Sequence, residues 1–321
     1  MDYIHDFDSD IAYVLEECEK RILEYPSGIK QFAYKYLDKL HLLKDKNQSG
    51  GFCYLMPFWL MDTFGIERRI CRNIAIGNSF ALLYFMSQDE VMDDCTQKSK
   101  VELLPVSSLF FTEFISSYQS TFPGESSFWQ YFDKYMKEWA GSVVWERSNH
   151  WGQANEYTEE DLILLSRKAA PMKIPFAAMS ILSGNELAVK AFSDMVDYDQ
   201  IVYQMIDDWR DWKEDMEIGN YTYLLVQAVK YNNLKEASQL NESLVRKAVY
   251  IGGIAEEIFE LAKKYNKLSL ECISNIDSPY LRDYISLEEI ICDKILTNIR
   301  EEKGIMMKGG LDSLLWSIKR S

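Results

Sequence analysis

The sequence predicts an all-α protein built as a single-domain bundle of antiparallel helices. Only 15 Gly and 7 Pro occur in 321 residues, which leaves room for long uninterrupted helices. Alternation typical of strands is almost absent, whereas apolar residues recur at helical spacing along most of the chain. No repeat, low-complexity tract or shift in composition marks a boundary, so we expect residues 1–321 to form one domain.

The helical periodicity separates the chain into consecutive segments. The first helices are expected over residues 10–24, 28–45, 54–64, 66–94, 101–121 and 125–148. Thr158 and Asp161 form a capping box that opens the next helix, and Pro171 and Pro175 should kink or break it. A long Asp-rich helix then ends near Gly219. The remaining helices are expected near 222–231, 241–266, 268–275 and 286–302, with a short segment at 310–320.

The charge balance limits the classes of partner. With 35 basic and 50 acidic residues the formal net charge is −15, which argues against nucleic acid and against anionic membrane surfaces. A phosphate-bearing ligand would need local Lys, Arg or metal ions to bind such a chain. Hydrophobic residues make up 47% of the sequence, which is ample for a sizeable core.

The cysteines and the N-terminus indicate a cytoplasmic protein. The six Cys include no CxxC pair, so they are expected to be free thiols in a reducing compartment. Three His do not suffice for a convincing zinc site. The N-terminal residues lack the pattern of a signal peptide, and no apolar run reaches the length of a membrane-spanning helix. Stable insertion into a membrane is therefore not expected.

Three aspartates in the Asp-rich helix form the main functional candidate. Asp207, Asp211 and Asp215 are spaced four residues apart and so lie on one helix face. Each pair of like charges at this spacing disfavours the helix by roughly 0.2–0.5 kcal/mol, and no Lys or Arg lies at i+4 of any of the three. Ligand sets made only of oxygen select hard cations, foremost Mg²⁺. The alternative is a solvated acidic face without a ligand.

Two other groups of charged residues could belong to the same site. Asp89 and Asp93 are also four apart, at the end of an apolar helix, where acidic side chains oppose the helix dipole. An acidic helix end without function is the alternative. Arg167 and Lys168 directly precede the proline break and are a candidate contact for an anion. Their alternative is an ordinary pair of basic side chains reaching solvent past an apolar surface.

Taken together, the acidic motifs resemble those of the class I isoprenoid synthases. Residues 89–93 (DEVMD) resemble the first aspartate-rich motif, DDxxD, with Glu in place of the second Asp. Residues 204–211 (QMIDDWRD) resemble the second motif of trans-prenyl diphosphate synthases. In the register of terpene cyclases, Asp207, Asp211 and Asp215 match the three metal-binding positions of the NSE triad. Residues 210–215 (RDWKED) are also similar to squalene and phytoene synthases.

This resemblance, which covers residues 30 to 225, implies a bundle around a central cavity and a set of roles. It implies three Mg²⁺ ions held by Asp89, Asp93, Asp207, Asp211 and Asp215, with Asp94 and Asp208 left open as further ligands. It implies a diphosphate bound by Arg167 and Lys168, with a late Arg contact for which Arg282 is favoured over Arg320. It implies an aromatic, cation-stabilising wall that we assign to Tyr84, Phe85, Trp145, Phe176 and Trp212. Homodimers are also common in the family.

Departures from the family pattern narrow the expected reaction. Condensing synthases bind isopentenyl diphosphate through a Gly-Gly-Lys-x-x-Arg segment, whereas residues 50–55 read GGFCYL. They also carry an Arg-Arg pair after the first motif, whereas residues 95–100 read CTQKSK. A second diphosphate without cationic contacts is electrostatically implausible in a chain of net charge −15.

We therefore expect a class I terpene synthase. It would ionise one allylic diphosphate, farnesyl or geranylgeranyl, with Mg²⁺ and cyclise the cation to a hydrocarbon or alcohol. One alternative is a trans-prenyltransferase, either chain-elongating or of the squalene/phytoene head-to-head type. The other is a non-catalytic helical protein that binds divalent ions.

Overall fold

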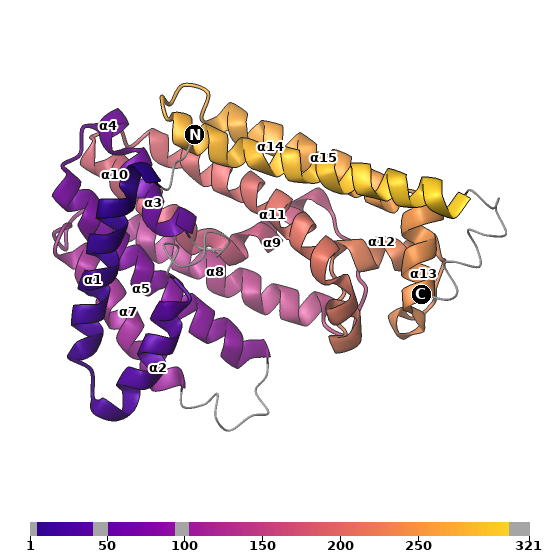
Figure 1. Ribbon diagram of the computed structural model, residues 1–321, viewed down its shortest axis with the longest axis horizontal. Helices are drawn as coiled ribbons and strands as arrows, with labels where there is room; N and C mark the ends of the chain where they lie inside the picture. Colours follow the sequence, from indigo (N-terminus) through magenta and orange to yellow (C-terminus); the bar gives the residue numbers. More distant parts are fainter. Residues whose placement is uncertain (1–4, 41–50, 94–102, 308–321) are drawn as a thin grey trace. The chain divides into compact units, whose positions relative to one another are not determined.

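The computed structural model describes residues 5–40, 51–93 and 103–307, and these residues are almost entirely helical (Figure 1). They contain no strand, only one isolated antiparallel bridge between Trp151 and Asn220. The predicted all-α class is confirmed. No helix within these ranges is both long enough and apolar enough to cross a membrane. Asp94, residues 95–100, the segment 310–320 and Arg320 lie outside the described residues.

The described chain divides into two compact units. Unit 1 comprises Met1–Asp133, Pro171–Lys190 and Ile276–Leu281, and unit 2 comprises Lys134–Ala170, Ala191–Asn275 and Arg282–Ser321. The expectation of a single domain over residues 1–321 stays a prediction.

Unit 1 has an aromatic core. Its helices are α1 (Asp8–Leu23), α2 (Ser27–Asp38), α3 (Gly51–Trp59), α4 (Met61–Phe64), α5 (Arg68–Asp93), α7 (Leu103–Gln119), α10 (Lys173–Leu182) and the first turns of α8 (Phe128–His150), preceded by the 3₁₀ turn η1 (His5–Phe7). Gly77 lets α5 approach α7 closely, since a Cβ atom there would lie 3.0 Å from the Tyr118 ring. Tyr118 in turn stacks on Phe128 of α8 at 5.0 Å between ring centroids. This packing fixes α5, the helix that carries the first acidic motif.

A buried ion-pair cluster joins α1 to α5. Asp10 is fully buried on α1 and accepts hydrogen bonds from Arg68 at 2.8 Å and from Arg72 at 2.7 Å. Both arginines lie at the start of α5. A buried carboxylate is tolerated here because two guanidinium groups compensate its lost hydration.

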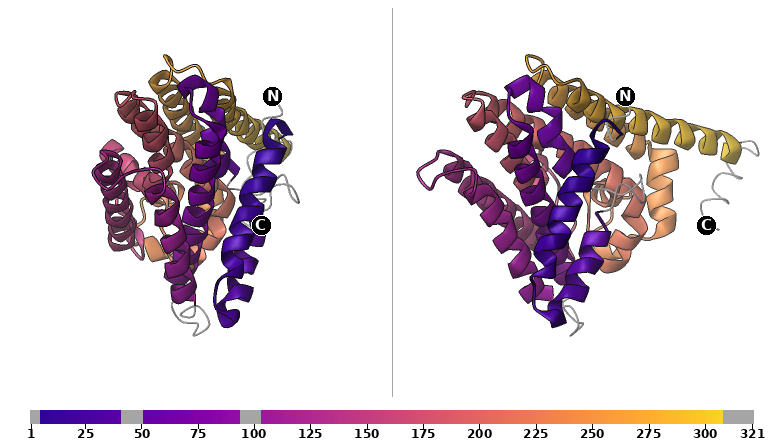
Figure 2. Two further views of the ribbon diagram at one scale, coloured as in Figure 1. Left: turned by 90° about the vertical axis from the view of Figure 1, so that its left-hand side faces the viewer. Right: turned by 60° about the vertical axis from the view of Figure 1, so that its left-hand side comes forward.

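Unit 2 is built on α11. Its elements are the rest of α8, α9 (Glu159–Ser166), the 3₁₀ segment η2 (Arg167–Met172, shared with unit 1), α11 (Ala188–Ile218), α12 (Tyr223–Tyr231), η3 (Ala237–Gln239), α13 (Glu242–Lys247), the π-helical turn η4 (Ala248–Gly252), α14 (Ile254–Cys272) and most of α15 (Pro279–Met307). Figures 1 and 2 show α14 and α15 running side by side. The core of unit 2 includes Val202 of α11, Leu225 of α12, Phe259 of α14 and Leu296 of α15.

Several expected helix boundaries are confirmed and others are wrong. The capping box of Thr158 and Asp161 is present, and the helix it opens gives way to η2 at the break before Pro171. Pro175 does not break the chain, because it lies in the first turn of α10, where its missing N–H is not needed. The expected helix 241–266 is interrupted at Gly253, whose φ of +78° favours glycine, and α14 then runs on to Cys272 without the expected break near residue 267.

Two carboxyl groups share the interior of unit 2. Asp199 of α11 is 3% exposed and Glu288 of α15 is 6% exposed, and the two side chains are hydrogen-bonded to each other. Gln200 donates to Asp199 at 3.3 Å, and Asn266 of α14 hydrogen-bonds to Glu288. Burial raises the pKa of Asp199 to about 7, and burial together with the charge of Asp199 raises the pKa of Glu288. The pair therefore retains a proton near neutral pH.

This retained proton makes the stability of the protein depend on pH. Between pH about 4 and about 7 the folded pair keeps a proton that the unfolded chain has released, so raising the pH lowers the free energy of unfolding in this window. In the wild-type protein this effect should lower the free energy of unfolding by about 1–3 kcal/mol as the pH rises through the window. The double variant Asp199→Asn/Glu288→Gln should lose this pH dependence. Urea unfolding followed by circular dichroism at pH 5 and pH 8 measures it. The exposed Asp293→Asn variant on α15 is the control, and an unchanged pH slope in the double variant would contradict the assignment.

Candidate active site

The second acidic motif lies on a stretch of α11 whose other side is locked into the core. Ile201, Met205 and Ile206 are buried, and the Trp209 ring meets Phe259 of α14 edge-on at 5.8 Å. Since these contacts fix the rotation of the helix, the carboxylate stripe cannot turn away to another side. Asp207 and Asp215 are half-buried on this stripe, and Asp211 is exposed.

The carboxylates of the stripe repel one another. Burial and the neighbouring charge of Asp211 raise the pKa of Asp207. Burial, and the charges of Asp207 and Asp211, raise the pKa of Asp215 to about 6, although Asn220 donates a hydrogen bond to it at 3.1 Å. Burial is the larger cause of both shifts, and the charges of the neighbouring carboxylates add to it.

Asp208, next to the stripe, has a structural role. It is 2% exposed, and its two oxygens accept hydrogen bonds from Gln204 at 2.8 Å and from the backbone N–H of Tyr223 at 3.1 Å. Tyr223 is the first residue of α12, and Thr222 before it makes no capping hydrogen bond of its own. Asp208 thus caps α12 from another helix. Burial raises its pKa to about 7.

Lys168 is ion-paired on η2, and its charge acts on the carboxyl groups of α11. The Lys168 ammonium on η2 is 2.6 Å and 2.9 Å from the two carboxylate oxygens of Glu146 on α8. Its charge offsets part of the rise in the pKa values of Asp207, Asp208 and Asp215. The Nε atom of Arg167 is buried and has no hydrogen-bond partner among the described residues.

An aromatic cluster borders the same carboxylates. His150 stacks on Tyr157 at 3.9 Å between ring centroids, and Trp145 meets the His150 ring edge-on at 5.1 Å. Tyr157 also meets Tyr223 edge-on at 5.6 Å. Burial, followed by the charge of Asp208, raises the pKa of Tyr157, and burial lowers that of His150. The predicted wall residue Trp145 therefore belongs to an aromatic cluster beside the second motif.

The first acidic motif lies at the end of α5 in unit 1. Asp89 is exposed, and it follows Phe85 by one helical turn. Phe85 and Tyr84 are half-buried, and their rings meet edge-on at 4.9 Å. Glu90, which replaces the second Asp of the motif, accepts a hydrogen bond from Tyr36 of α2 at 2.5 Å. The side chain of Asp93, the last residue of α5, is outside the described part of the structure.

Comparison with known proteins identifies the fold. No family model and no curated protein matches the sequence. The solved structures that it resembles include a geranylgeranyl pyrophosphate synthetase from the archaeon Geoglobus acetivorans, with a TM-score of 0.66 and 16% identity over 90% of this chain and 98% of that one. A decaprenyl diphosphate synthase from Rhodobacter capsulatus gives a TM-score of 0.70 and 15% identity over 92% and 98%. A heptaprenyl diphosphate synthase from Staphylococcus aureus gives 0.69 and 15% over 89% and 98%.

The chain has the all-α isoprenoid synthase fold. This confirms the expected fold class, and the similarity extends over nearly the whole length of those structures. The three proteins are named as synthases or synthetases of prenyl diphosphates or pyrophosphates. At 15–16% identity the likeness shows the fold, and the predicted superfamily and the terpene cyclase activity stay predictions.

Other predicted site residues of this isoprenoid synthase fold are placed as follows. Phe176 is buried in α10 of unit 1. Trp212 packs against the core of unit 2, with the Lys213 ammonium 5.5 Å from its ring centroid. Arg282 donates from Nη2 to the backbone oxygens of Ile273 and Ser274, at 2.8 Å each, and so caps the end of α14. Roles of these residues in catalysis or in diphosphate binding stay predictions.

The carboxylate oxygens on α11 are ligand atoms of the type that a hard divalent cation prefers. Carboxylate oxygens are the ligands that Mg²⁺ prefers, and the raised pKa values of Asp207 and Asp215 show charge that a cation would relieve. Close by, Asn220 Oδ1 and Thr222 Oγ1 are buried without a hydrogen-bond partner. Within the described ranges no three His, Cys, Asp or Glu side chains already form a metal-binding group. A cation would therefore have to draw its carboxylate ligands together.

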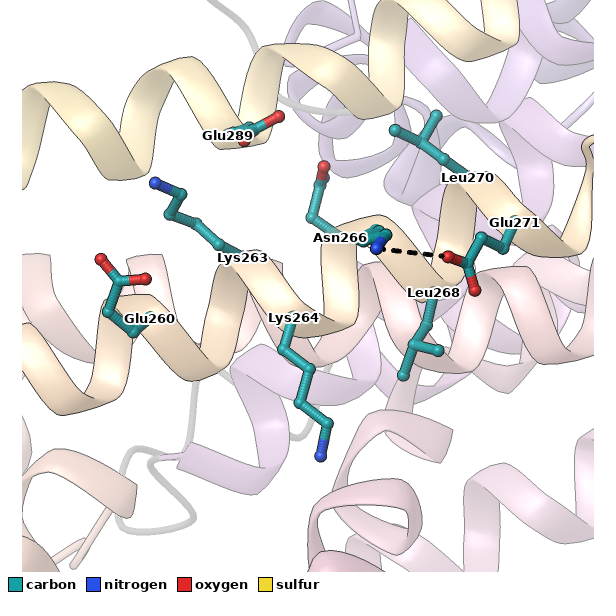
Figure 3. A pocket seen from close by; sticks show the side chains of 9 residues that line it. Glu260, Lys263, Lys264, Asn266, Leu268, Leu270, Glu271 and Glu289 are labelled. Atoms are coloured by element: carbon teal, nitrogen blue, oxygen red, sulfur yellow. Dashed lines mark ion pairs between the residues drawn. The ribbon is translucent and has the colours of Figure 1, made fainter.

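A separate hollow of about 750 Å³ lies between α14 and α15 (Figure 3). Its lining includes Lys263, Lys264 and Lys267, which form ion pairs with Asp293, Glu159 and Glu271 respectively. None of the predicted site residues lines it. Its three lysines are already paired with acidic side chains, so they offer an anion less than free ammonium groups would.

Glu146, His150 and Tyr157 were missed by the sequence analysis. One signal was available, because Glu146 and His150 are four residues apart on α8, on the face that also carries Trp145 one position earlier. Their contact with η2 and with the end of α11 depends on tertiary packing, which periodicity does not reveal.

Two aspartates one helical turn apart should differ sharply in their effect on stability. Asp208→Ala removes the cap of α12 and leaves the Tyr223 N–H without its acceptor, and it should lower the free energy of unfolding by about 1–3 kcal/mol. Asp211→Ala relieves repulsion at an exposed position and should be neutral or slightly stabilising. Urea unfolding in EDTA compares the two. Equal losses of stability would contradict the structural role of Asp208.

Proposed function

We propose that this protein is an enzyme that ionises an allylic prenyl diphosphate with the help of Mg²⁺. The observation that carries the proposal is the crowded carboxylate stripe on α11 beside the Lys168 ammonium, in a chain with the isoprenoid synthase fold. Crowded carboxylates near an ammonium group, in a chain with this fold, support a site for a divalent cation and an anion over a solvated acidic face.

Each group has a distinct task in this proposal. Asp207, Asp211 and Asp215 on α11 would hold Mg²⁺, three ions in the family pattern, and Asp89 and Asp93 on α5 would be further ligands. When bound, the metal withdraws charge from the leaving diphosphate. Lys168, together with Arg167 and Arg282, binds the diphosphate oxygens and neutralises the charge that develops on them as the C–O bond breaks. These basic residues act on the leaving group, not on the hydrocarbon.

The aromatic residues provide the environment of the carbocation. Rings stabilise positive charge through their electron-rich faces and offer no nucleophile. We assign this task to the predicted residues Tyr84, Phe85, Trp145, Phe176 and Trp212. Tyr157 and His150 join them, because they pack with Trp145 beside the second motif.

Prenyl transfer is the fate of the cation that the comparisons favour. The three similar structures reported above are named as synthases or synthetases of prenyl diphosphates or pyrophosphates, and they match about nine-tenths of this chain. The resemblance of residues 204–211 (QMIDDWRD) to the second motif of trans-prenyl diphosphate synthases also supports this activity. We therefore place a trans-prenyltransferase, which was the alternative from the sequence, ahead of a cyclase.

Cyclisation remains the second candidate because of a specific feature of the sequence. Residues 50–55 (GGFCYL) and 95–100 (CTQKSK) lack the Lys and Arg with which condensing synthases bind a second diphosphate. An acceptor without a diphosphate, or no acceptor at all, would suit this site better. Localisation in the cytoplasm and assembly as a homodimer are further parts of the proposal.

Product analysis separates these fates. The protein is incubated with Mg²⁺ and C10, C15 or C20 allylic diphosphates, with and without isopentenyl diphosphate, and the extracts are analysed by gas chromatography. A transferase gives a longer or doubled chain, whereas a cyclase gives a hydrocarbon or alcohol from the allylic substrate alone. Absence of product from every allylic diphosphate would leave a non-catalytic ion-binding protein and would contradict the proposal.

Loss of the predicted metal ligands should abolish turnover. Asp211→Ala and the double variant Asp89→Ala/Asp93→Ala should each lower kcat/KM at least about 100-fold. Each variant removes carboxylate ligands of the Mg²⁺ ions whose charge stabilises the leaving diphosphate. Glu217→Ala is the matched control and should retain activity, because Glu217 is an exposed acid on α11 that is not at i+3, i+4 or i+7 from any of the three aspartates. Wild-type rates in the double variant would remove the first motif from the mechanism.

A further inference from the structure

The last turn of α5 is hydrogen-bonded to two neighbouring helices, on either side of Asp89. Gln88 donates from Nε2 to the Oγ of Ser107 on α7 at 2.8 Å, and Ser107 is fully buried. Glu90 accepts a hydrogen bond from the Tyr36 hydroxyl on α2 at 2.5 Å. Consecutive side chains leave an α-helix about 100° apart, so the exposed Asp89 lies in the arc between these two contacts. All five residues belong to unit 1.

The Tyr36 hydroxyl is a donor whose position is fixed by the core. Tyr36 is 2% exposed, and its ring packs against the Phe110 ring of α7 with 6.2 Å between the centroids. Burial, followed by the hydrogen bond to Glu90, raises the pKa of Tyr36, so the hydroxyl keeps its proton and donates. The Lys39 ammonium lies 3.6 Å from the same Glu90 oxygen and 4.6 Å from the centroid of the Tyr36 ring. A hydroxyl and an ammonium of α2 thus both contact one carboxylate of α5.

This contact depends on the length of the side chain at position 90. The side chain of Asp is one methylene shorter than that of Glu. At this position it cannot keep a 2.5 Å contact with a hydroxyl that the core holds in place, unless one of the two helices moves. Residues 89–93 (DEVMD) differ from DDxxD at this same position.

We propose that Tyr36 is a positioning residue that acts through Glu90. Their hydrogen bond fixes the last turn of α5, so that Asp89 is presented to a divalent cation, and Glu90 serves as the link to α2 and not as a metal ligand. Glu replaces Asp in the motif because only the longer side chain reaches Tyr36. The inference rests on one part of the proposed function, that Asp89 binds a metal.

A ligand role for Glu90 predicts the opposite result for the same substitutions. If Glu90 itself bound the cation, the Tyr36 hydroxyl would compete for its oxygen, and Tyr36→Phe would leave the metal affinity unchanged or raise it. Glu90→Asp, which restores DDxxD, would then also keep the affinity. If Glu90 is the link to α2, both substitutions lower the affinity. Neither substitution changes the net charge, so a loss cannot come from a weaker negative field around the motif.

The test measures Mn²⁺ binding to the full-length protein by electron paramagnetic resonance, without substrate. Its readout is the bound Mn²⁺ whose affinity falls in Asp89→Asn. Tyr36→Phe and Glu90→Asp should each weaken this binding by about tenfold, the scale typical of groups that orient a metal ligand. The two substitutions combined should cost less than about twofold more than either alone, because both remove one contact. Glu90→Asp is the second variant should Tyr36→Phe fail to fold.

The control removes a hydroxyl from the same helix. Tyr34 lies on α2 two positions before Tyr36 and therefore on a different face, so Tyr34→Phe should leave Mn²⁺ affinity unchanged. In an Asp89→Asn background, Tyr36→Phe should change the remaining Mn²⁺ binding less than about twofold.

Three outcomes would overturn the inference. Unchanged or tighter Mn²⁺ binding in Tyr36→Phe, or equal weakening by Tyr36→Phe with and without Asp89, would leave the proposed function intact. Full Mn²⁺ binding in Asp89→Asn would overturn both the inference and the proposed role of Asp89 as a metal ligand.

Discussion

The mutual repulsion of the carboxylates on α11 is the constraint on which the rest of the site depends. Two pairs of like charges at i,i+4 disfavour the helix, yet burial of Met205, Ile206 and neighbouring apolar residues fixes its orientation. Partial burial of Asp207 and Asp215 adds the cost of desolvation and raises their pKa values. The fold thus maintains a concentration of negative charge that a divalent cation would stabilise.

Some residues around the carboxylate stripe stabilise the fold, and others change the charge of the site. Asp208 points into the protein and caps α12, so it organises the end of the site without adding to its exposed charge. The charge of Lys168 offsets part of the rise in the pKa values of Asp207, Asp208 and Asp215. Lys168 itself is held by an ion pair with Glu146. Hydrogen bonds from Gly152 to Gly219 and from Tyr221 to His150 join the ends of α8 and α11, which brings the aromatic cluster to the same place.

Local signals in the sequence predicted the helical class, the carboxylate stripe, the capping box at Thr158 and the break before Pro171, because each depends on residues a few positions apart. They did not predict the pairs Glu146–Lys168 and Asp199–Glu288, since these join helices that are distant in the sequence. Adjacency in the sequence also could not show that Lys168 pairs with Glu146 of α8.

The central claim is that the charge on α11 serves to ionise a prenyl diphosphate through a bound divalent cation. The magnesium dependence of diphosphate release from farnesyl or geranylgeranyl diphosphate tests it most directly. The account predicts release that rises with Mg²⁺ concentration and stops when the metal is chelated. Release that is independent of Mg²⁺, or no release from any allylic diphosphate at saturating Mg²⁺, would contradict it.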